Sequence, residues 1–238
     1  FVDELIYQLE DQSDSPKFIF GITMGNHGLY GGKFHDSDID ITATGEGYTD
    51  EEIMVMENYS YGLELADAAL GKLYDYVQQR ERPTVVVYFG DHLPSLAGSY
   101  DIYNKSNGIP TGGSEVWNDE QKLYMFSTPY VTFANYDTGR EYAADGQAVS
   151  TYHLVSLMND YIDAPNCPMN QALMNLYQVC PVYNSRYSIY SNDPNDPMVS
   201  QANQVQRMFT YDDLSGSKYM QQDLDSSGFW EQAKQQKE

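Results

Sequence analysis

An aspartate and a histidine that could hold a metal ion follow directly after an apolar run of the chain. The run is Val85–Phe89, Gly90 ends it, and Asp91 and His92 come next. A glycine where a strand leaves a sheet lets the backbone turn, so that two successive side chains can face one crevice. A carboxylate beside an imidazole suits Zn, Mn or Fe better than it suits a soft metal. Asp91 and His92 are therefore candidate metal ligands, although an Asp-His pair after a strand is more often an ordinary loop pair.

A second histidine stands between flexible residues at the end of another apolar run. Residues 18–24 are largely apolar, and Gly25, Asn26, His27 and Gly28 follow. A histidine in such a loop is well placed to donate to a substrate oxygen, whereas a structural histidine more often lies within a helix or strand. The residues alone favour a functional and a structural role for His27 equally.

Both segments resemble parts of one enzyme family. The segment GDHLPSL after the valine-rich run resembles the metal-binding segment of the lipoteichoic acid synthase and sulfatase branch of the alkaline phosphatase superfamily. The segment FIFGITMGNHGLY is similar to the strand and loop that carry the substrate-contacting histidine in those phosphoglycerol transferases. The two segments occur in the family's order, with a helix predicted between them.

The resemblance implies a fold and a chemistry. It implies an α/β fold with a mixed, largely parallel central sheet flanked by helices, incomplete at its amino-terminal side. Residues 1–223 would be the carboxy-terminal part of a sulfatase-like catalytic domain, and residues 224–238 a polar tail. Asp91 and His92 would hold a divalent metal, Mn first and Mg or Ca as alternatives, while His27 and Asn26 would bind the substrate. The whole enzyme would transfer phosphoglycerol from a phosphatidylglycerol-like lipid to a glycerol-phosphate or glycan acceptor.

The nucleophile that the resemblance implies is absent from the chain. In this family a threonine on the metal attacks the phosphodiester, and it precedes the strand that here begins near Lys17. The threonines of this chain stand in the wrong order to replace it, so we assign no catalytic residue. We therefore expect an enzyme fragment that is inactive alone, from a bacterial protein that is secreted or anchored to the extracellular face of the membrane by an upstream segment. The alternatives are a sulfatase or phosphodiesterase on the same scaffold, and a non-catalytic glycan-binding protein.

The elements that must position these residues follow from periodicity and capping. We expect helices over residues 2–9, 50–79, 150–162 and 166–180, the second beginning at a Thr49 cap. Residues 17–24 and 85–89 should be buried strands, and residues 122–135 a strand region interrupted by Pro129. Residues 97–120 should form a loop with Trp117 tucked beneath it, and residues 209–220 look like the family's closing strand and turn. His153 is expected to be a core or surface residue and not a ligand.

Composition excludes several partners. The formal net charge of −22 over 238 residues argues against nucleic acid and anionic membrane surfaces, which reward clusters of Lys and Arg. No run approaches the roughly 20 apolar residues of a membrane span. Cys167 and Cys180 lie close together in sequence, and the pattern leaves open whether they form a disulfide. Neither has a neighbouring His or a Cys-x-x-Cys partner, which argues against catalysis or zinc binding by them.

Overall fold

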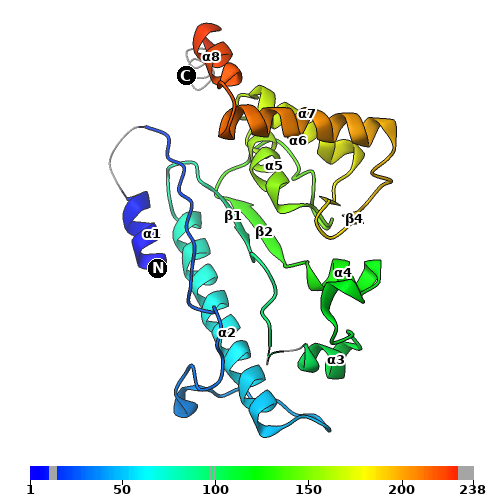
Figure 1. Ribbon diagram of the computed structural model, residues 1–238. Helices are drawn as coiled ribbons and strands as arrows, with labels where there is room; N and C mark the ends of the chain where they lie inside the picture. The colour runs from blue at the N-terminus through cyan, green and yellow to red at the C-terminus, as the bar shows by residue number, and fades with distance from the viewer. Residues whose placement is uncertain (11–14, 97, 99, 230–238) are drawn as a thin grey trace. The chain divides into compact units, whose positions relative to one another are not determined.

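The computed structural model describes residues 1–10, 15–96, 98 and 100–229 (Figure 1). The chain divides into two compact units, which we describe separately. Unit 1 consists of Phe1–Thr84 and Gly90–Thr128, and unit 2 of Val85–Phe89 and Pro129–Glu238. The division does not test the predicted boundary at residue 223, and residues 230–238 of the predicted tail lie outside the described residues.

A long helix organises unit 1. Helix α1 (Val2–Leu9) packs against α2 (Asp50–Gln78), and both helices confirm the sequence prediction (Figure 1). The Thr49 side chain accepts a hydrogen bond from the Glu52 backbone N–H, and the Glu52 side chain accepts one from the Thr49 N–H. This capping box satisfies two of the donors that a helix start leaves free. Glu52 also accepts two hydrogen bonds of 2.7 Å from Lys105, which ties the start of α2 to a distant part of the unit.

Residues 16–24 form neither helix nor strand, so the prediction of a buried strand there is wrong. Phe18, Phe20, Ile22 and Met24 are each between 63% and 69% exposed. An apolar strand is buried only when other strands flank it and other layers cover its faces. Within the described part of the chain no strand pairs with this segment.

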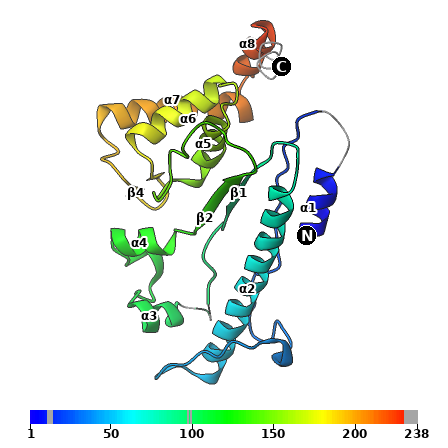
Figure 2. The same cartoon turned by 180° about the vertical axis from the view of Figure 1, so that it is seen from behind.

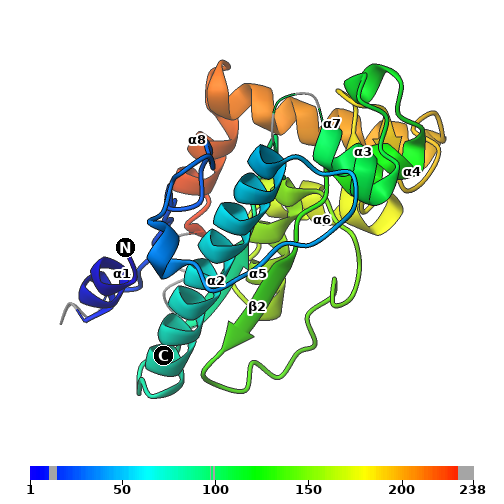
Figure 3. The ribbon, with the colours of Figure 1, turned by 90° about the horizontal axis from the view of Figure 1, so that it is seen from below.

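The prediction of a loop over residues 97–120 is wrong in part, because helical segments interrupt the described residues of this range. The range contains α3 (Asp101–Asn107) and a 3-10 helix (Gly113–Glu115), and α4 (Asp119–Met125) begins at its end (Figure 3). Trp117 is buried as predicted, and its Nε1 donates to the Pro110 carbonyl at 2.7 Å. Burial of scattered apolar side chains decides the structure here. They form one core cluster: Tyr30, Val55, Leu96, Ile102, Tyr103, Ile109, Trp117 and Met125.

Unit 2 contains the valine-rich strand. Strand β1 (Val85–Phe89) pairs antiparallel with β2 (Tyr130–Ala134), with Val87 opposite Thr132. Both strands are only partly buried, since Tyr88 of β1 and Val131 of β2 remain exposed. A second pair, β3 (Tyr183–Asn184) and β4 (Ile189–Tyr190), is also antiparallel. The α/β class is confirmed, but the parallel pairs that we expected do not occur among the described residues.

Helices make up the rest of unit 2. A 3-10 helix (Thr151–His153) leads into α5 (Leu154–Tyr161), and α6 (Pro168–Val179) packs beside α7 (Pro197–Leu214) (Figure 2). Helix α8 (Tyr219–Ser226) follows, so the expected closing strand over residues 209–220 is wrong. Cys180 is buried between α6 and α7 in a cluster with Leu176 and Val199. Both cysteines are free thiols. No described helix has the length and apolar character of a membrane span.

Candidate metal and substrate site

Gly90 fixes the backbone just before the Asp-His pair. A Cβ at this position would lie 3.0 Å from the Thr128 Cβ, and the Thr128 hydroxyl donates to the Gly90 carbonyl at 2.6 Å. Gly90 is not among the glycines with positive φ. The lack of a side chain at Gly90 therefore lets Thr128 pack close to the backbone, and the special turn that the sequence suggested is not present.

Asp91 and His92 converge on one point at the surface. His92 Nε2 lies 3.5 Å from Asp91 Oδ2, with the two side chains 66% and 80% exposed. His92 Nδ1 lies 2.9 Å from the Leu93 carbonyl oxygen, an arrangement that suits an Nδ1–H donor. With that tautomer, the Nε2 lone pair and the carboxylate oxygen face each other as two acceptors. A proton on Nε2 or a metal ion between the two groups resolves this conflict.

The donor set fits a divalent metal. Imidazole nitrogen and carboxylate oxygen both bind such ions, and a backbone carbonyl on the other ring nitrogen is the usual partner of a ligating histidine. Two ligands are fewer than the three or four of a complete protein site. Among the described residues, no group of three or more His, Cys, Asp and Glu side chains is arranged to hold a metal. The metal-ligand role of Asp91 and His92 therefore stays a prediction, and it would need further ligands.

His27 is exposed on the loop that follows residues 18–24. Its Nδ1 lies 2.9 Å from the Gly28 carbonyl oxygen. As at His92, this contact suits an Nδ1–H donor and leaves Nε2 free for another partner. The Lys33 ammonium donates to the His27 backbone carbonyl, so the loop is held from a second side.

Asn26 lies against helix α2. Its Oδ1 is buried without a hydrogen-bond partner in the described chain, and a Cβ on Gly62 would come within 2.0 Å of that atom. The absence of a side chain at Gly62 makes room for the Asn26 amide. The structure thus shows an Asn26 side chain packed against the helix at Gly62, and its direct contact with substrate stays a prediction.

Tyr30 connects the two predicted site loops. It is buried, its hydroxyl donates to the Asn26 carbonyl at 2.8 Å, and its ring packs edge-on against Tyr59 with centroids 5.3 Å apart. The same core cluster takes in Leu93 and Leu96, which follow the Asp-His pair. Burial raises the Tyr30 pKa, and the charges of Tyr59 and Asp91 raise it further. The His27 loop and the Asp91 loop therefore contribute to one core cluster, which contains Tyr30.

Sequence reasoning did not single out Tyr30 or Lys33. The available signal was an aromatic residue and a lysine close behind His27 in a glycine-rich stretch. That pattern gives no indication of which core the tyrosine enters.

His153 is a core residue, as expected. It is fully buried in unit 2, with its ring 4.4 Å from that of Tyr152 and 5.7 Å from that of Tyr177. Burial lowers the pKa of His153 to about 4. The residue is neutral at pH 7 and has no open face for a metal.

Comparison with known proteins identifies the family. The Sulfatase family model matches residues 1–164 of the chain. The chain belongs to the Sulfatase family. Asn26, His27, Asp91 and His92 all lie within the matched residues of this sulfatase-family chain, and α6, α7 and α8 lie beyond them.

Two known proteins are similar to this sulfatase-family chain. A Rhizobium meliloti (strain 1021) protein named "Putative cyclic beta-1,2-glucan modification protein" is 33% identical over 133 residues, which cover 56% of this chain and 20% of that protein. The solved structure of Streptococcus pyogenes phosphoglycerol transferase GacH in complex with sn-glycerol-1-phosphate matches with a TM-score of 0.59 and 20% identity, over 80% of this chain and 42% of that one. The GacH match supports the α/β fold that the sequence indicated. The chain thus spans a fifth of the curated relative and less than half of the solved one.

Proposed function

We propose that this chain supplies metal ligands and substrate contacts to a metal-dependent phosphoglycerol transferase. The observation that carries the proposal is the approach of His92 Nε2 and Asp91 Oδ2 to 3.5 Å, which places an imidazole nitrogen and a carboxylate oxygen within reach of one cation. Membership of the Sulfatase family supports enzyme chemistry on an oxyanion ester. GacH is a phosphoglycerol transferase by name, and the rhizobial protein is named for glucan modification. Together these names favour phosphoglycerol transfer to a glycan or glycerol-phosphate acceptor.

Asp91 and His92 would hold the metal, for which we propose Mn, with Mg or Ca as alternatives. A divalent ion there supplies polarisation of a phosphoryl oxygen and a lowered pKa for the attacking hydroxyl. His27 would present Nε2 to a phosphate oxygen or a glycerol hydroxyl, because its Nδ1 is directed to the Gly28 carbonyl. Asn26 and Tyr30 would hold that loop in place. The attacking threonine would come from outside these 238 residues.

The donor substrate would be the head group of a phosphatidylglycerol-like lipid. We place the reaction on the extracellular face of the membrane or in a secreted protein, because lipid head groups and envelope glycans meet there. The strongly acidic chain gives no reason to invoke nucleic acid as a partner.

The test is metal-dependent release of diacylglycerol from phosphatidylglycerol by the complete encoded protein. Asp91→Ala should reduce turnover by more than about 100-fold, since even the loss of an outer partner of a metal ligand costs 10–100-fold. The matched control is Asp75→Ala, an exposed acid on α2, which should keep turnover unchanged. Turnover that persists in Asp91→Ala would remove Asp91 from the mechanism.

The same assay separates the competing functions. Sulfate released from a sulfate ester, with no diacylglycerol from phosphatidylglycerol, would assign the scaffold to a sulfatase. A folded protein that turns over neither compound with any divalent metal would favour a non-catalytic glycan-binding protein.

A further inference from the structure

Lys33 is a cation without a carboxylate partner in the described structure. Elsewhere in the chain, Lys72 pairs with Asp3, Lys105 with Glu52 and Lys218 with Asp213. No ion pair joins Lys33 to a described acid, although the formal net charge of the chain is −22. Its ammonium donates to a backbone carbonyl, that of His27. The one hydrogen bond leaves two of its three donors for another partner.

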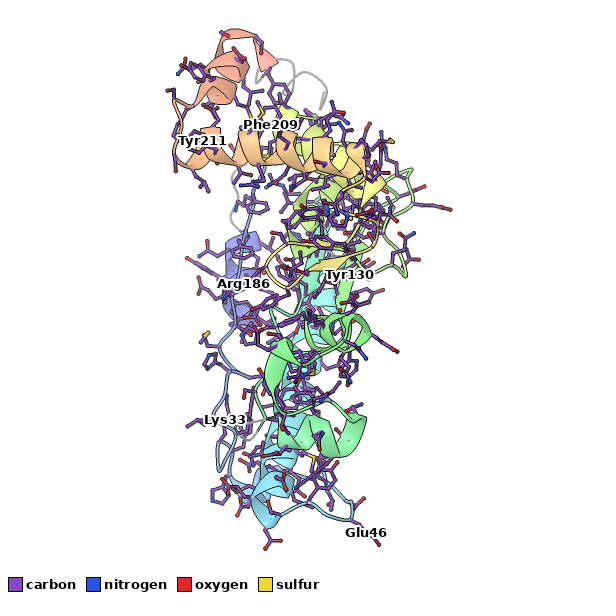
Figure 4. All side chains as sticks on the ribbon, turned by 45° about the vertical axis from the view of Figure 1, so that its right-hand side comes forward. Lys33, Glu46, Tyr130, Arg186, Phe209 and Tyr211 are labelled. Carbon is purple, nitrogen blue, oxygen red and sulfur yellow. The ribbon has the colours of Figure 1, made fainter. Side chains whose placement is uncertain are left out.

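Two aromatic rings hold this ammonium in position. Figure 4 labels Lys33. The Lys33 Nζ lies 5.6 Å from the ring centroid of Tyr30 and 5.8 Å from that of Phe34. A ring face attracts a cation without neutralising it, so the ammonium keeps its full charge for a ligand. The side chain is half-buried, which limits the number of positions that it can take. The charge is therefore partly pre-organised beside His27.

Tyr30 places Lys33 in the same neighbourhood as the Asp-His pair. The Lys33 ammonium lies over the Tyr30 ring, and the core cluster of Tyr30 includes Leu93, one residue beyond His92. Burial raises the pKa of Tyr30, and the charges of Tyr59 and Asp91 raise it further. Lys33 and the His27 loop thus contact one buried tyrosine, and Leu93 of the Asp91 loop packs in the core cluster of that tyrosine.

We propose that Lys33 is a specificity-determining residue that binds a non-bridging oxygen of the anionic group of the substrate, a phosphoester, beside His27. The identity of that anion rests on the proposed function. A charge-assisted hydrogen bond from Lys33 distinguishes a phosphoester from an uncharged head group of the same size. Lys33 would then select for charge, while the metal ligands act on the reacting atoms.

The first measurement is equilibrium binding of sn-glycerol-1-phosphate and, separately, of inorganic phosphate to the complete encoded protein with Mn. Lys33→Met keeps the length and apolar stem of the side chain and removes the charge. It should weaken binding of both anions about tenfold or more, as expected for the loss of a hydrogen bond to a charged group. Lys33→Arg should stay within about threefold of the natural protein because it keeps the charge. Lys72→Met removes an exposed lysine from a surface ion pair and should leave binding unchanged.

A second measurement separates charge recognition from a structural role. Raising the ionic strength should weaken anion binding in the natural protein much more than in Lys33→Met. Glycerol, which has no charge, should inhibit phosphatidylglycerol turnover equally in both proteins. Weaker glycerol inhibition in Lys33→Met would mean that the loop had moved, and would overturn the proposal.

The outcomes distinguish this proposal from the proposed function. Unchanged anion binding in Lys33→Met overturns the role of Lys33, even when the natural protein turns over phosphatidylglycerol. Weakened binding in Lys33→Met, in a protein that does not turn over the lipid, supports Lys33 as an anion-binding residue and overturns the transferase assignment. A natural protein that binds neither anion overturns both.

Discussion

The two histidines of the site share one local device. In each, Nδ1 lies 2.9 Å from the backbone carbonyl oxygen of the next residue, which is Gly28 for His27 and Leu93 for His92. Such a contact orients the ring and selects which nitrogen stays available. The orientation of both rings, and the nitrogen that each leaves available, therefore depend on the adjacent backbone and not on distant residues.

A third histidine, His153, behaves in the opposite way because it is buried. We predict that unit 2 loses stability as the pH falls below 6.5. The folded-state pKa is about 4 and the ordinary value 6.5, so between them the unfolded chain binds more protons than the folded one. The free energy of unfolding then decreases on acidification, by about 3 kcal/mol when the pH has passed the folded pKa.

Urea unfolding of the natural chain and of His153→Leu between pH 4 and pH 7 measures this effect. Carboxylates contribute equally to both proteins, so the difference between the two curves isolates His153. The curve of His153→Leu should be flatter over the interval from pH 6.5 to 4. Parallel curves would show that protonation of His153 is not coupled to folding.

Helix α2 shows how an element positions the site. Its start is fixed by the Thr49 and Glu52 capping box, and its middle carries Gly62, against which the Asn26 amide rests. Asn26 in turn receives the Tyr30 hydroxyl on its carbonyl. Glycine destabilises a helix interior, but here Gly62 makes room for the loop that carries His27.

We predict opposite effects for the same substitution at two glycines of α2. Gly71→Ala should raise the free energy of unfolding by up to about 1 kcal/mol, because its Cβ would meet nothing within 4 Å. Gly62→Ala should lower it by about 1–3 kcal/mol, since its Cβ would overlap Asn26 Oδ1. Urea unfolding of both variants measures the contrast.

A double variant tests the cause. Asn26→Ala combined with Gly62→Ala removes the overlapping atom and should recover most of the stability that Gly62→Ala loses. Equal stability of Gly62→Ala and Gly71→Ala would show that Asn26 does not rest on the helix.

The exposed apolar side chains of residues 18–24 affect how the whole polypeptide behaves in solution. Soluble proteins rarely leave a run of this kind uncovered, and an unpaired extended segment invites pairing with another strand. In the described chain Phe20 is 65% and Ile22 68% exposed. The 238-residue polypeptide therefore carries an open apolar segment directly before the His27 loop.

We predict that this segment makes the 238-residue polypeptide bind hydrophobic dyes and self-associate. Phe20→Lys with Ile22→Lys should lower dye fluorescence about twofold or more and shift light scattering to smaller particles. The control adds two lysines at exposed polar positions, Thr44→Lys with Gln79→Lys, so that net charge changes equally. Equal behaviour of the two double variants would mean that net charge, and not this segment, controls association.

The sequence by itself determined the local features. Helix α2 and its Thr49 cap, helix α6, the valine-rich strand and the Asp91–His92 pair all follow from capping residues, periodicity and motif, which act within a few residues. The metal and substrate roles of these residues stay predictions. The α/β class and the family were also within reach of the sequence, because two motifs in the family's order carry them.

Only the tertiary structure decided which segments are buried and what meets at the site. The apolar pattern of residues 18–24 predicts a buried strand, but these residues are exposed. Burial of a strand depends on neighbouring strands and layers, which a local pattern does not specify. The sequence predicts loop and strand for residues 101–125, but this range contains helices whose Tyr103 and neighbouring Trp117 are buried in the core cluster. Tyr30 joins the His27 loop to the Asp91 loop through contacts between residues about 60 positions apart, and such contacts leave no local signature because a side chain's burial is set by the whole chain.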